Sequence, residues 1–152
     1  MRVVIRSYRP ADYEAVVALV TSVLAEYGFS AHVGGVQRDL AAIEDGYSRG
    51  GFWVAEIDGA IAGTVAIRPK DGSTTCELKR LYVSKTARGR GVGRALYAHA
   101  EAFARGAGYE RIWLDSSRKF VEARRLYEKN GFVLLEELAN EWCDNVYEKR
   151  LT

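Results

Sequence analysis

The segment 88–93, Arg-Gly-Arg-Gly-Val-Gly, constrains this chain more than any other feature. It follows a run rich in strand-forming residues, 74–83, and precedes an apolar stripe with helical spacing that begins at Val92. Glycines at such a junction let the backbone turn tightly, and the first N–H groups of the helix have no partner within the helix. Because a helix start of this kind attracts anions, the pattern predicts a diphosphate-binding site.

Two familiar phosphate loops do not fit these residues. A P-loop ends in Gly-Lys-Ser/Thr, whereas Gly93 is followed by Arg94 and an alanine. The dinucleotide fingerprint requires a different glycine spacing and an early strand of a parallel unit. A tight turn without a ligand stays open as the structural alternative, but the arginines at 88, 90 and 94 favour phosphate, to which guanidinium groups donate charge-assisted hydrogen bonds.

The remaining pattern predicts a mixed α/β domain that occupies residues 1–152 as one unit. The expected order is β-α-α-β-β-β-α-β-α-β-β, without internal repeats. Asp58-Gly59 predicts a type I′ hairpin turn. Strict alternation along 74–83 would place Glu77 and Lys79, and by extension Leu81, on one face. The other face would then carry Leu78, Arg80 and Tyr82. Helices are expected over 13–24, 36–47, 92–107 and 121–130, and strands over 3–6, 52–57, 60–68, 74–83, 111–115, 133–138 and 146–151.

Charge and composition narrow the classes of partner. The net charge is +2, and the basic residues cluster around 79–94 and 118–129, which suits one small polyanion and not a nucleic acid. The longest apolar run, 15–25, is shorter than the roughly 20 residues that a bilayer requires. No secretory signal is visible, so we expect a cytoplasmic protein. Cys76 and Cys143 lack metal-ligand spacing, so we expect neither a metal nor a disulfide.

Three motifs in order resemble the GNAT superfamily of N-acetyltransferases. They are the strand 77–83, the loop 88–93 and the segment 126–132, Leu-Tyr-Glu-Lys-Asn-Gly-Phe. The loop is similar to the family's Q/R-x-x-G-x-G/A motif, which receives the pyrophosphate of coenzyme A. The third, extended to Ala123, is similar to A-x-x-L-Y-x-x-x-G-F. The resemblance covers nearly the whole chain, and it implies an enzyme that uses acetyl-CoA as cosubstrate.

The resemblance also implies a layout for the cosubstrate. The fourth strand splays from its neighbour, and its backbone pairs with the pantetheine arm. The N–H of Val83 is the expected donor to the thioester carbonyl. Phe120 departs from the family, because many members have an asparagine there. The expected cosubstrate residues are Leu81, Tyr82, Val83, Arg88, Gly89, Arg90, Gly91, Val92, Gly93 and Arg94.

Two residues are candidates for acid–base chemistry. Glu77 lies where some family members carry a glutamate base, which would remove the proton of the acceptor amine directly or through water. A solvent-exposed or salt-bridged strand glutamate is the structural alternative. Tyr127 lies where the family has the tyrosine that protonates the leaving thiolate, and its alternative is a packed core tyrosine.

The resemblance further implies that the acceptor enters between the loops at 27–35 and 139–145. Tyr27, Phe29, His32 and Trp142 are the candidate contacts, since aromatic and acidic residues suit a cationic amine. A small-molecule amine is favoured over a protein N-terminus or lysine. The rival functions are an acetyl-CoA sensor without turnover and a regulator that binds another nucleotide. An open edge at the terminal strands would also allow a homodimer.

Overall fold

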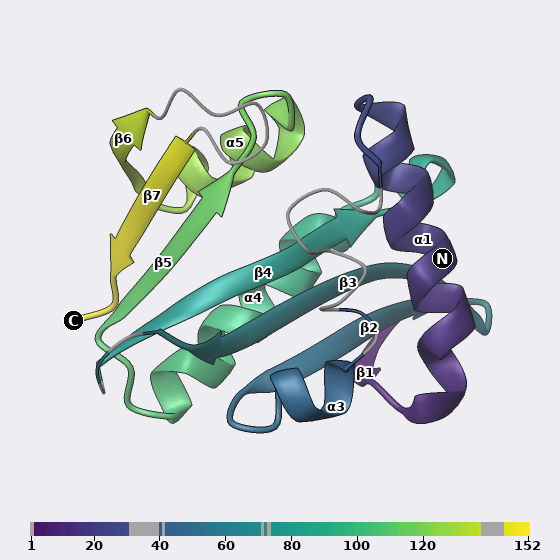
Figure 1. Cartoon of the computed structure of the whole chain (residues 1–152), viewed down its shortest axis with the longest axis horizontal. Coiled ribbons are helices and arrows are strands. Elements are labelled where there is room, and N and C mark those ends of the chain that lie inside the picture. Colours follow the sequence, from purple (N-terminus) through teal and green to yellow (C-terminus); the bar gives the residue numbers. More distant parts are fainter. Residues whose placement is uncertain (1, 31–39, 41, 71, 73, 138–144) are drawn as a thin grey trace.

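A computed structural model describes residues 2–30, 40, 42–70, 72, 74–137 and 145–152. They form a seven-stranded mixed sheet with helices on both faces (Figure 1). The order across the sheet is β1-β2-β3-β4-β5-β7-β6. The strands are β1 Val3–Ser7, β2 Gly51–Ile57, β3 Ala60–Pro69, β4 Thr75–Val83, β5 Arg111–Ser116, β6 Val133–Glu137 and β7 Asn145–Arg150.

The order of helices and strands confirms the predicted mixed α/β fold. Of the predicted helix at 36–47, residues 36–39 and 41 lie outside the description; Leu40 is helical, and Ile43–Gly46 form a short helix. None of the helices in the described part combines the length and the apolar character that crossing a bilayer demands. The helices are α1 Tyr13–Glu26, α3 Ile43–Gly46, α4 Val92–Gly106 and α5 Val121–Lys129, with 3₁₀ turns η1 Pro10–Asp12 and η3 Lys85–Ala87.

Alternation along the strands divides the core between the two faces of the sheet. In β2, Trp53 packs in the cluster that contains α4 side chains, and Val54 packs in the cluster that contains α1 side chains. Figure 1 shows α1 in front of the sheet and α4 behind it. A Cβ atom at Gly63 would lie 2.7 Å from the Leu96 side chain and 2.9 Å from the Tyr82 carbonyl oxygen. Glycine at this position therefore lets α4 lie close against β3.

A bulge interrupts β4 next to the predicted site. The pairing of β3 with β4 shifts register between Thr64 and Ala66, and Arg80 has a φ of 57°. The buried Thr64 hydroxyl donates a 2.7 Å hydrogen bond to the Arg80 carbonyl. Because a bulge adds one residue to its strand, Leu81 packs in the α4-side cluster and Tyr82 in the α1-side cluster. Strict alternation was therefore the wrong prediction beyond residue 79.

The predicted splay of the central strands is confirmed. β4 pairs with β5 only over Thr75–Glu77, opposite 111–113. Beyond these residues β4 continues along β3 to Val83, whereas β5 continues along β7 to Ser116. The facing edges separate, so the backbone of β4 from residue 78 onward has no ladder partner on the β5 side among the described residues. Figure 1 shows β4 and β5 diverging toward the end that leads into α4 and α5.

Candidate active site

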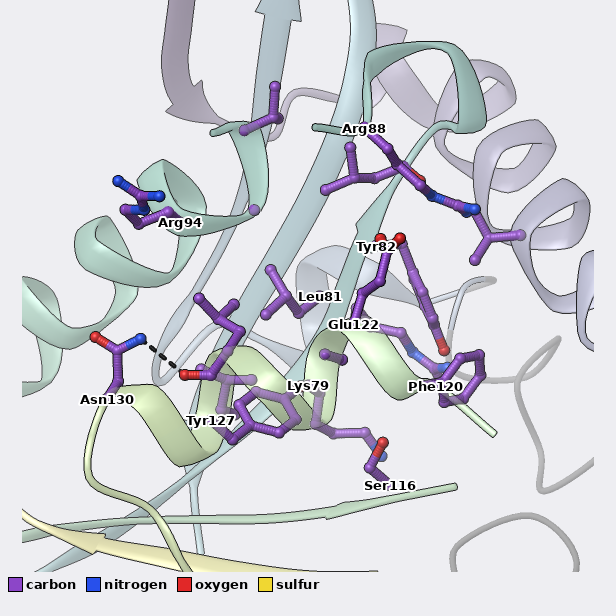
Figure 2. Close-up of a pocket in the computed structure, with 18 of the residues that line it drawn as sticks. Lys79, Leu81, Tyr82, Arg88, Arg94, Ser116, Phe120, Glu122, Tyr127 and Asn130 are labelled. Carbon is purple, nitrogen blue, oxygen red and sulfur yellow. Dashed lines mark hydrogen bonds between the residues drawn. The ribbon is translucent and has the colours of Figure 1, made fainter. Parts of the chain in front are cut away.

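A cavity of about 870 Å³ lies along the divergent end of β4 (Figure 2). The splayed strand forms one wall, the start of α4 forms one end, and α5 forms the opposite side. Of the ten residues expected to hold the cosubstrate, Arg90 is not among the lining residues. The other nine line the cavity: Leu81, Tyr82, Val83, Arg88, Gly89, Gly91, Val92, Gly93 and Arg94.

The glycine loop presents the positive end of α4 to this cavity. Gly89 and Gly91 have φ values of 76° and 80°, which side-chain-bearing residues rarely adopt. A Cβ atom at either glycine would meet nothing within 4 Å, so the backbone conformation, and not space, requires glycine there. The N–H of Ala95 donates to the Gly91 carbonyl at 3.0 Å. The N–H groups of residues 92–94 precede this first helical bond and have no partner within the helix.

Tyr127 lies at the buried side of the cavity. Its ring packs at 5.5 Å from that of Phe132 and at 5.9 Å from that of Tyr147. Among the described residues no group hydrogen-bonds its hydroxyl. Burial raises the pKa of Tyr127, and Tyr82 and Tyr147 raise it further. The hydroxyl is therefore protonated at neutral pH, as a general acid must be.

Glu77 lies to one side of the cavity. Its carboxylate is buried and accepts a 3.0 Å hydrogen bond from Nε of Arg68, its cross-strand partner on β3. Leu78 and Lys79 line the cavity, but Glu77 is not among the lining residues of the described chain. The structure thus brings Tyr127 and the glycine loop to one cavity and holds Glu77 in an ion pair beside it.

An aromatic group forms the wall on the side where the sequence predicts the acceptor. The ring of Phe120 lies 4.8 Å from Tyr27, 5.8 Å from Phe29 and 6.2 Å from Tyr82. Tyr27, Tyr82 and Phe120 line the cavity, and Phe29 packs against them from outside it. Nζ of Lys119 lies 5.0 Å from the centre of the Phe29 ring. His32 and Trp142 lie outside the described residues, as does the rest of the segment 138–144.

Sequence reasoning missed two polar groups near the cavity. Asn130 lines it, and its Nδ2 donates to the Leu126 carbonyl at 2.8 Å near the end of α5. Its place before Gly131 in the third motif could have identified it from the sequence. Thr64 holds the bulge, and it could have been identified as the lone hydroxyl in the largely apolar strand β3. Within the described ranges, no three His, Cys, Asp or Glu side chains cluster as metal ligands would.

Comparisons with known proteins agree with this geometry. The model of the acetyltransferase (GNAT) family matches residues 18–132. The uncharacterized N-acetyltransferase YjgM of Escherichia coli (strain K12) is 34% identical over 135 residues, which cover 85% of this chain and 81% of that protein.

Solved structures share the fold. A GNAT-family acetyltransferase of Staphylococcus aureus Mu50 has a TM-score of 0.90 at 23% identity, covering 99% of this chain and 100% of its own. YncA of Salmonella typhimurium, whose structure was solved with acetyl-CoA, has a TM-score of 0.81 at 20% identity. The match covers 100% of this chain and 95% of the YncA chain. With the family model matching most of its length, this chain belongs to the GNAT family of acetyl-CoA-dependent N-acetyltransferases.

Proposed function

We propose that this enzyme transfers the acetyl group of acetyl-CoA to the primary amine of a small molecule, by direct attack within a ternary complex. One observation carries the proposal. A single cavity combines a strand edge without a ladder partner among the described residues, a helix start whose N–H groups have no partner within the helix, and a buried, protonated tyrosine. Each of these groups suits a different part of the same reaction.

The cavity fits acetyl-CoA in size and chemistry. Its volume of about 870 Å³ lies in the usual range for small-molecule and cofactor sites, roughly 300–1,000 Å³. The N–H groups at residues 92–94 and the guanidinium of Arg94 would hold the diphosphate. The backbone at Leu81 and Val83 would pair with the amides of the pantetheine arm, as an added strand pairs with a sheet edge.

The residues around the thioester have complementary roles in the transfer. The amine nitrogen attacks the thioester carbonyl carbon, a C–N bond forms and the C–S bond breaks. The N–H of Val83 stabilises the carbonyl oxygen as it gains charge. Tyr127 gives its proton to the departing sulfur. Glu77 receives the proton of the amine through a water, because its carboxylate is beside the cavity and not in its lining.

The aromatic wall favours a small acceptor. The rings of Tyr27, Tyr82 and Phe120 narrow the acceptor side and offer apolar faces. A compact amine with an apolar or cationic body can stack on these faces, whereas a lysine of a folded protein needs an open groove.

We also propose the cytoplasmic location and the homodimer expected from the sequence. β6 is an edge strand with Val133 and Leu135 exposed, which favours a second copy there.

The first test combines binding and turnover. Calorimetric titration with acetyl-CoA, coenzyme A and ATP is followed by thiol release with a panel of amines that includes polyamines, amino acids, aminoglycosides and lysine peptides. We expect selective binding of the coenzymes and amine-dependent thiol release. Tyr127→Phe should lower kcat by about 10²-fold, because it removes the acid and keeps the packed ring. Absence of coenzyme binding would refute the proposal.

The other outcomes identify the rival functions. Binding of acetyl-CoA without thiol release from any amine would indicate a sensor. Preference for ATP would indicate a regulator of another kind. Release with lysine or N-terminal peptides alone would identify a protein acceptor. Tyr109 is not among the residues that line the cavity, so Tyr109→Phe serves as the matched control for loss of a phenol hydroxyl.

A further inference from the structure

Arg88 is bound by protein groups on the side of the cavity next to α1. Its two terminal nitrogens donate to the Glu26 carboxylate at 2.6 and 2.9 Å, and its Nε donates to the Val83 carbonyl at 3.1 Å. The side chains are about one-fifth exposed, 20% for Arg88 and 23% for Glu26. Figure 2 shows Arg88 extending away from Arg94. Two parallel hydrogen bonds between guanidinium and carboxylate fix orientation as well as distance.

Three elements meet at this contact. Glu26 is the last residue of α1, Val83 is the last residue of β4, and Arg88 opens the glycine loop. The next residue after Glu26, Tyr27, has its ring 6.0 Å from the Arg88 guanidinium carbon and 4.8 Å from the ring of Phe120. The contact therefore joins the aromatic wall of the acceptor side to the loop and strand end on the cosubstrate side.

We propose that Glu26 and Arg88 form a clamp that positions the glycine loop and the end of β4 for acetyl-CoA. Glu26 is then a positioning residue, and Arg88 acts through Glu26 and the Val83 carbonyl and not as a direct phosphate ligand. This role rests on the proposed function. It differs from the phosphate contact that the sequence led us to expect for Arg88.

Electrostatics and the clamp predict opposite signs for the same substitution. Glu26 places a negative charge near a site for a polyanion, so charge alone predicts that Glu26→Gln binds coenzyme A more tightly. Under the clamp the substitution releases Arg88 and the loop. Binding must then order them, which costs conformational entropy, so the affinity falls.

The first experiment measures that sign. Coenzyme A is titrated calorimetrically into the wild type, Glu26→Gln and Glu14→Gln. Glu14 is an exposed carboxylate in the first turn of α1 and is the control for the same change of charge on the same helix. We expect Kd to rise about threefold to tenfold in Glu26→Gln, the range for a partly exposed but well-oriented ion pair, and to stay unchanged in Glu14→Gln.

The outcomes separate the clamp from the proposed function. Equal or tighter binding by Glu26→Gln, while the wild type binds normally, overturns the clamp alone. Failure of the wild type to bind coenzyme A overturns the proposed function. Unfolding midpoints measured in the same buffer show whether Glu26→Gln is less stable in general. Ile112→Val, a destabilising change unrelated to the clamp, is measured in the same way. If its affinity falls in the same proportion to its loss of midpoint as in Glu26→Gln, the clamp is also overturned.

A double-mutant cycle tests whether Arg88 touches phosphate. If Arg88 works through Glu26, Arg88→Met weakens coenzyme A binding less in the Glu26→Gln background than in the wild type, because the clamp is already absent there. If Arg88 binds phosphate directly, Arg88→Met weakens binding as much in both backgrounds, because the same phosphate contact is lost in each. The salt dependence gives an independent readout. The double variant has the same net charge as the wild type. Under the clamp, the slope of log Kd against log salt concentration therefore stays that of the wild type, whereas loss of a phosphate contact makes this slope shallower.

Discussion

The two candidate catalytic residues have different surroundings. Tyr127 has its hydroxyl at the cavity without a hydrogen-bond partner among the described residues, and burial keeps it protonated. Glu77 is held by Arg68 at 3.0 Å, with the carboxylate side chain 11% exposed. Under the proposed function, the Tyr127 hydroxyl can therefore meet a reacting group, whereas the Glu77 carboxylate reaches one only through water or after a change of partner.

This difference makes the role of Glu77 testable. Glu77→Gln should lower kcat by about 10²-fold through loss of the base. The KM for acetyl-CoA should change little, because Glu77 does not line the cavity. Steady-state kinetics measure both constants. Arg68→Gln, which removes the ion pair but keeps the carboxylate, should lower kcat much less. An unchanged kcat in Glu77→Gln would leave the residue a structural role only.

At the scale of elements, the bulge in β4 depends on one buried hydroxyl. Thr64→Val should cost about 1–2 kcal/mol of unfolding free energy, because it removes the hydrogen bond from the buried Thr64 hydroxyl to the Arg80 carbonyl. The same change should weaken acetyl-CoA binding several-fold, because the bulge sets the edge of β4. Chemical denaturation and calorimetry measure the two effects. Thr64→Ser should retain both properties, and Thr21→Val, an exposed change of the same kind on α1, should alter neither.

The elements also show what the sequence could predict. The I′ turn at Asp58-Gly59 is confirmed by φ values of 51° and 81°, because this dipeptide specifies its turn locally. The bulge at Arg80 was not predictable from local preference, since arginine has no preference for a left-handed backbone. The bond from Thr64 stabilises it across strands. The pairing of Glu26 with Arg88 was missed for the same reason, because the two residues are far apart in the sequence.

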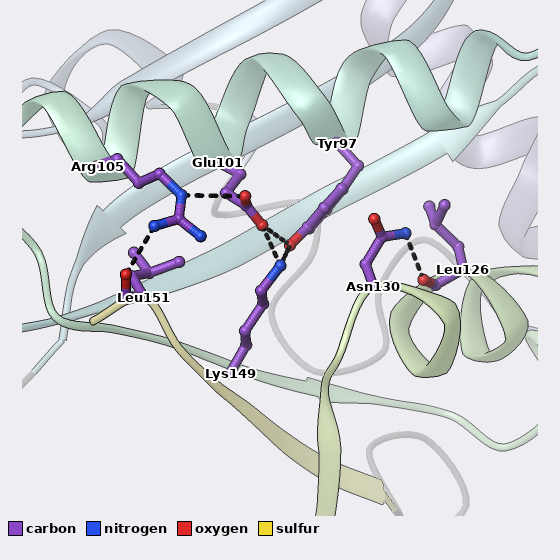
Figure 3. Close-up of polar contacts among 7 residues, drawn as sticks. All are labelled: Tyr97, Glu101, Arg105, Leu126, Asn130, Lys149 and Leu151. Atoms are coloured by element: carbon purple, nitrogen blue, oxygen red, sulfur yellow. Dashed lines mark hydrogen bonds and ion pairs between the residues drawn. The ribbon is translucent and has the colours of Figure 1, made fainter.

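At the scale of the whole molecule, polar contacts fix β7 to α4 (Figure 3). Oε1 of Glu101 accepts hydrogen bonds from the Tyr97 hydroxyl and from Lys149, both at 2.5 Å, and Oε2 accepts one from Arg105 at 3.1 Å. Arg105 also donates to the Leu151 carbonyl at 2.6 Å. Burial acts to raise the pKa of Glu101, but the hydrogen bonds from Lys149, Tyr97 and Arg105 hold it below its usual value.

These contacts predict a pH-dependent contribution to stability. Because the folded-state pKa of Glu101 is depressed, its contribution is present above the ordinary value of 4.5 and is lost as the pH falls through the folded value. Glu101→Gln should therefore lower the unfolding free energy by about 1–2 kcal/mol at pH 7, with a smaller deficit at pH about 3.5. Urea denaturation at both pH values measures it. A deficit that is equal at both, or one shared by the exposed Glu110→Gln, would contradict the assignment.

The splay of β4 from β5 has a consequence for how the molecule passes through a reaction cycle. An interior strand normally has neighbours on both sides, but from residue 78 onward β4 has a ladder partner on only one side among the described residues. Under the proposed function, acetyl-CoA supplies the second neighbour, and departure of coenzyme A returns the same backbone groups to water. Beyond the short β4–β5 ladder, the edge of β4 is thus paired on both sides only in the loaded enzyme, and each turnover completes and reopens that part of the hydrogen bonding.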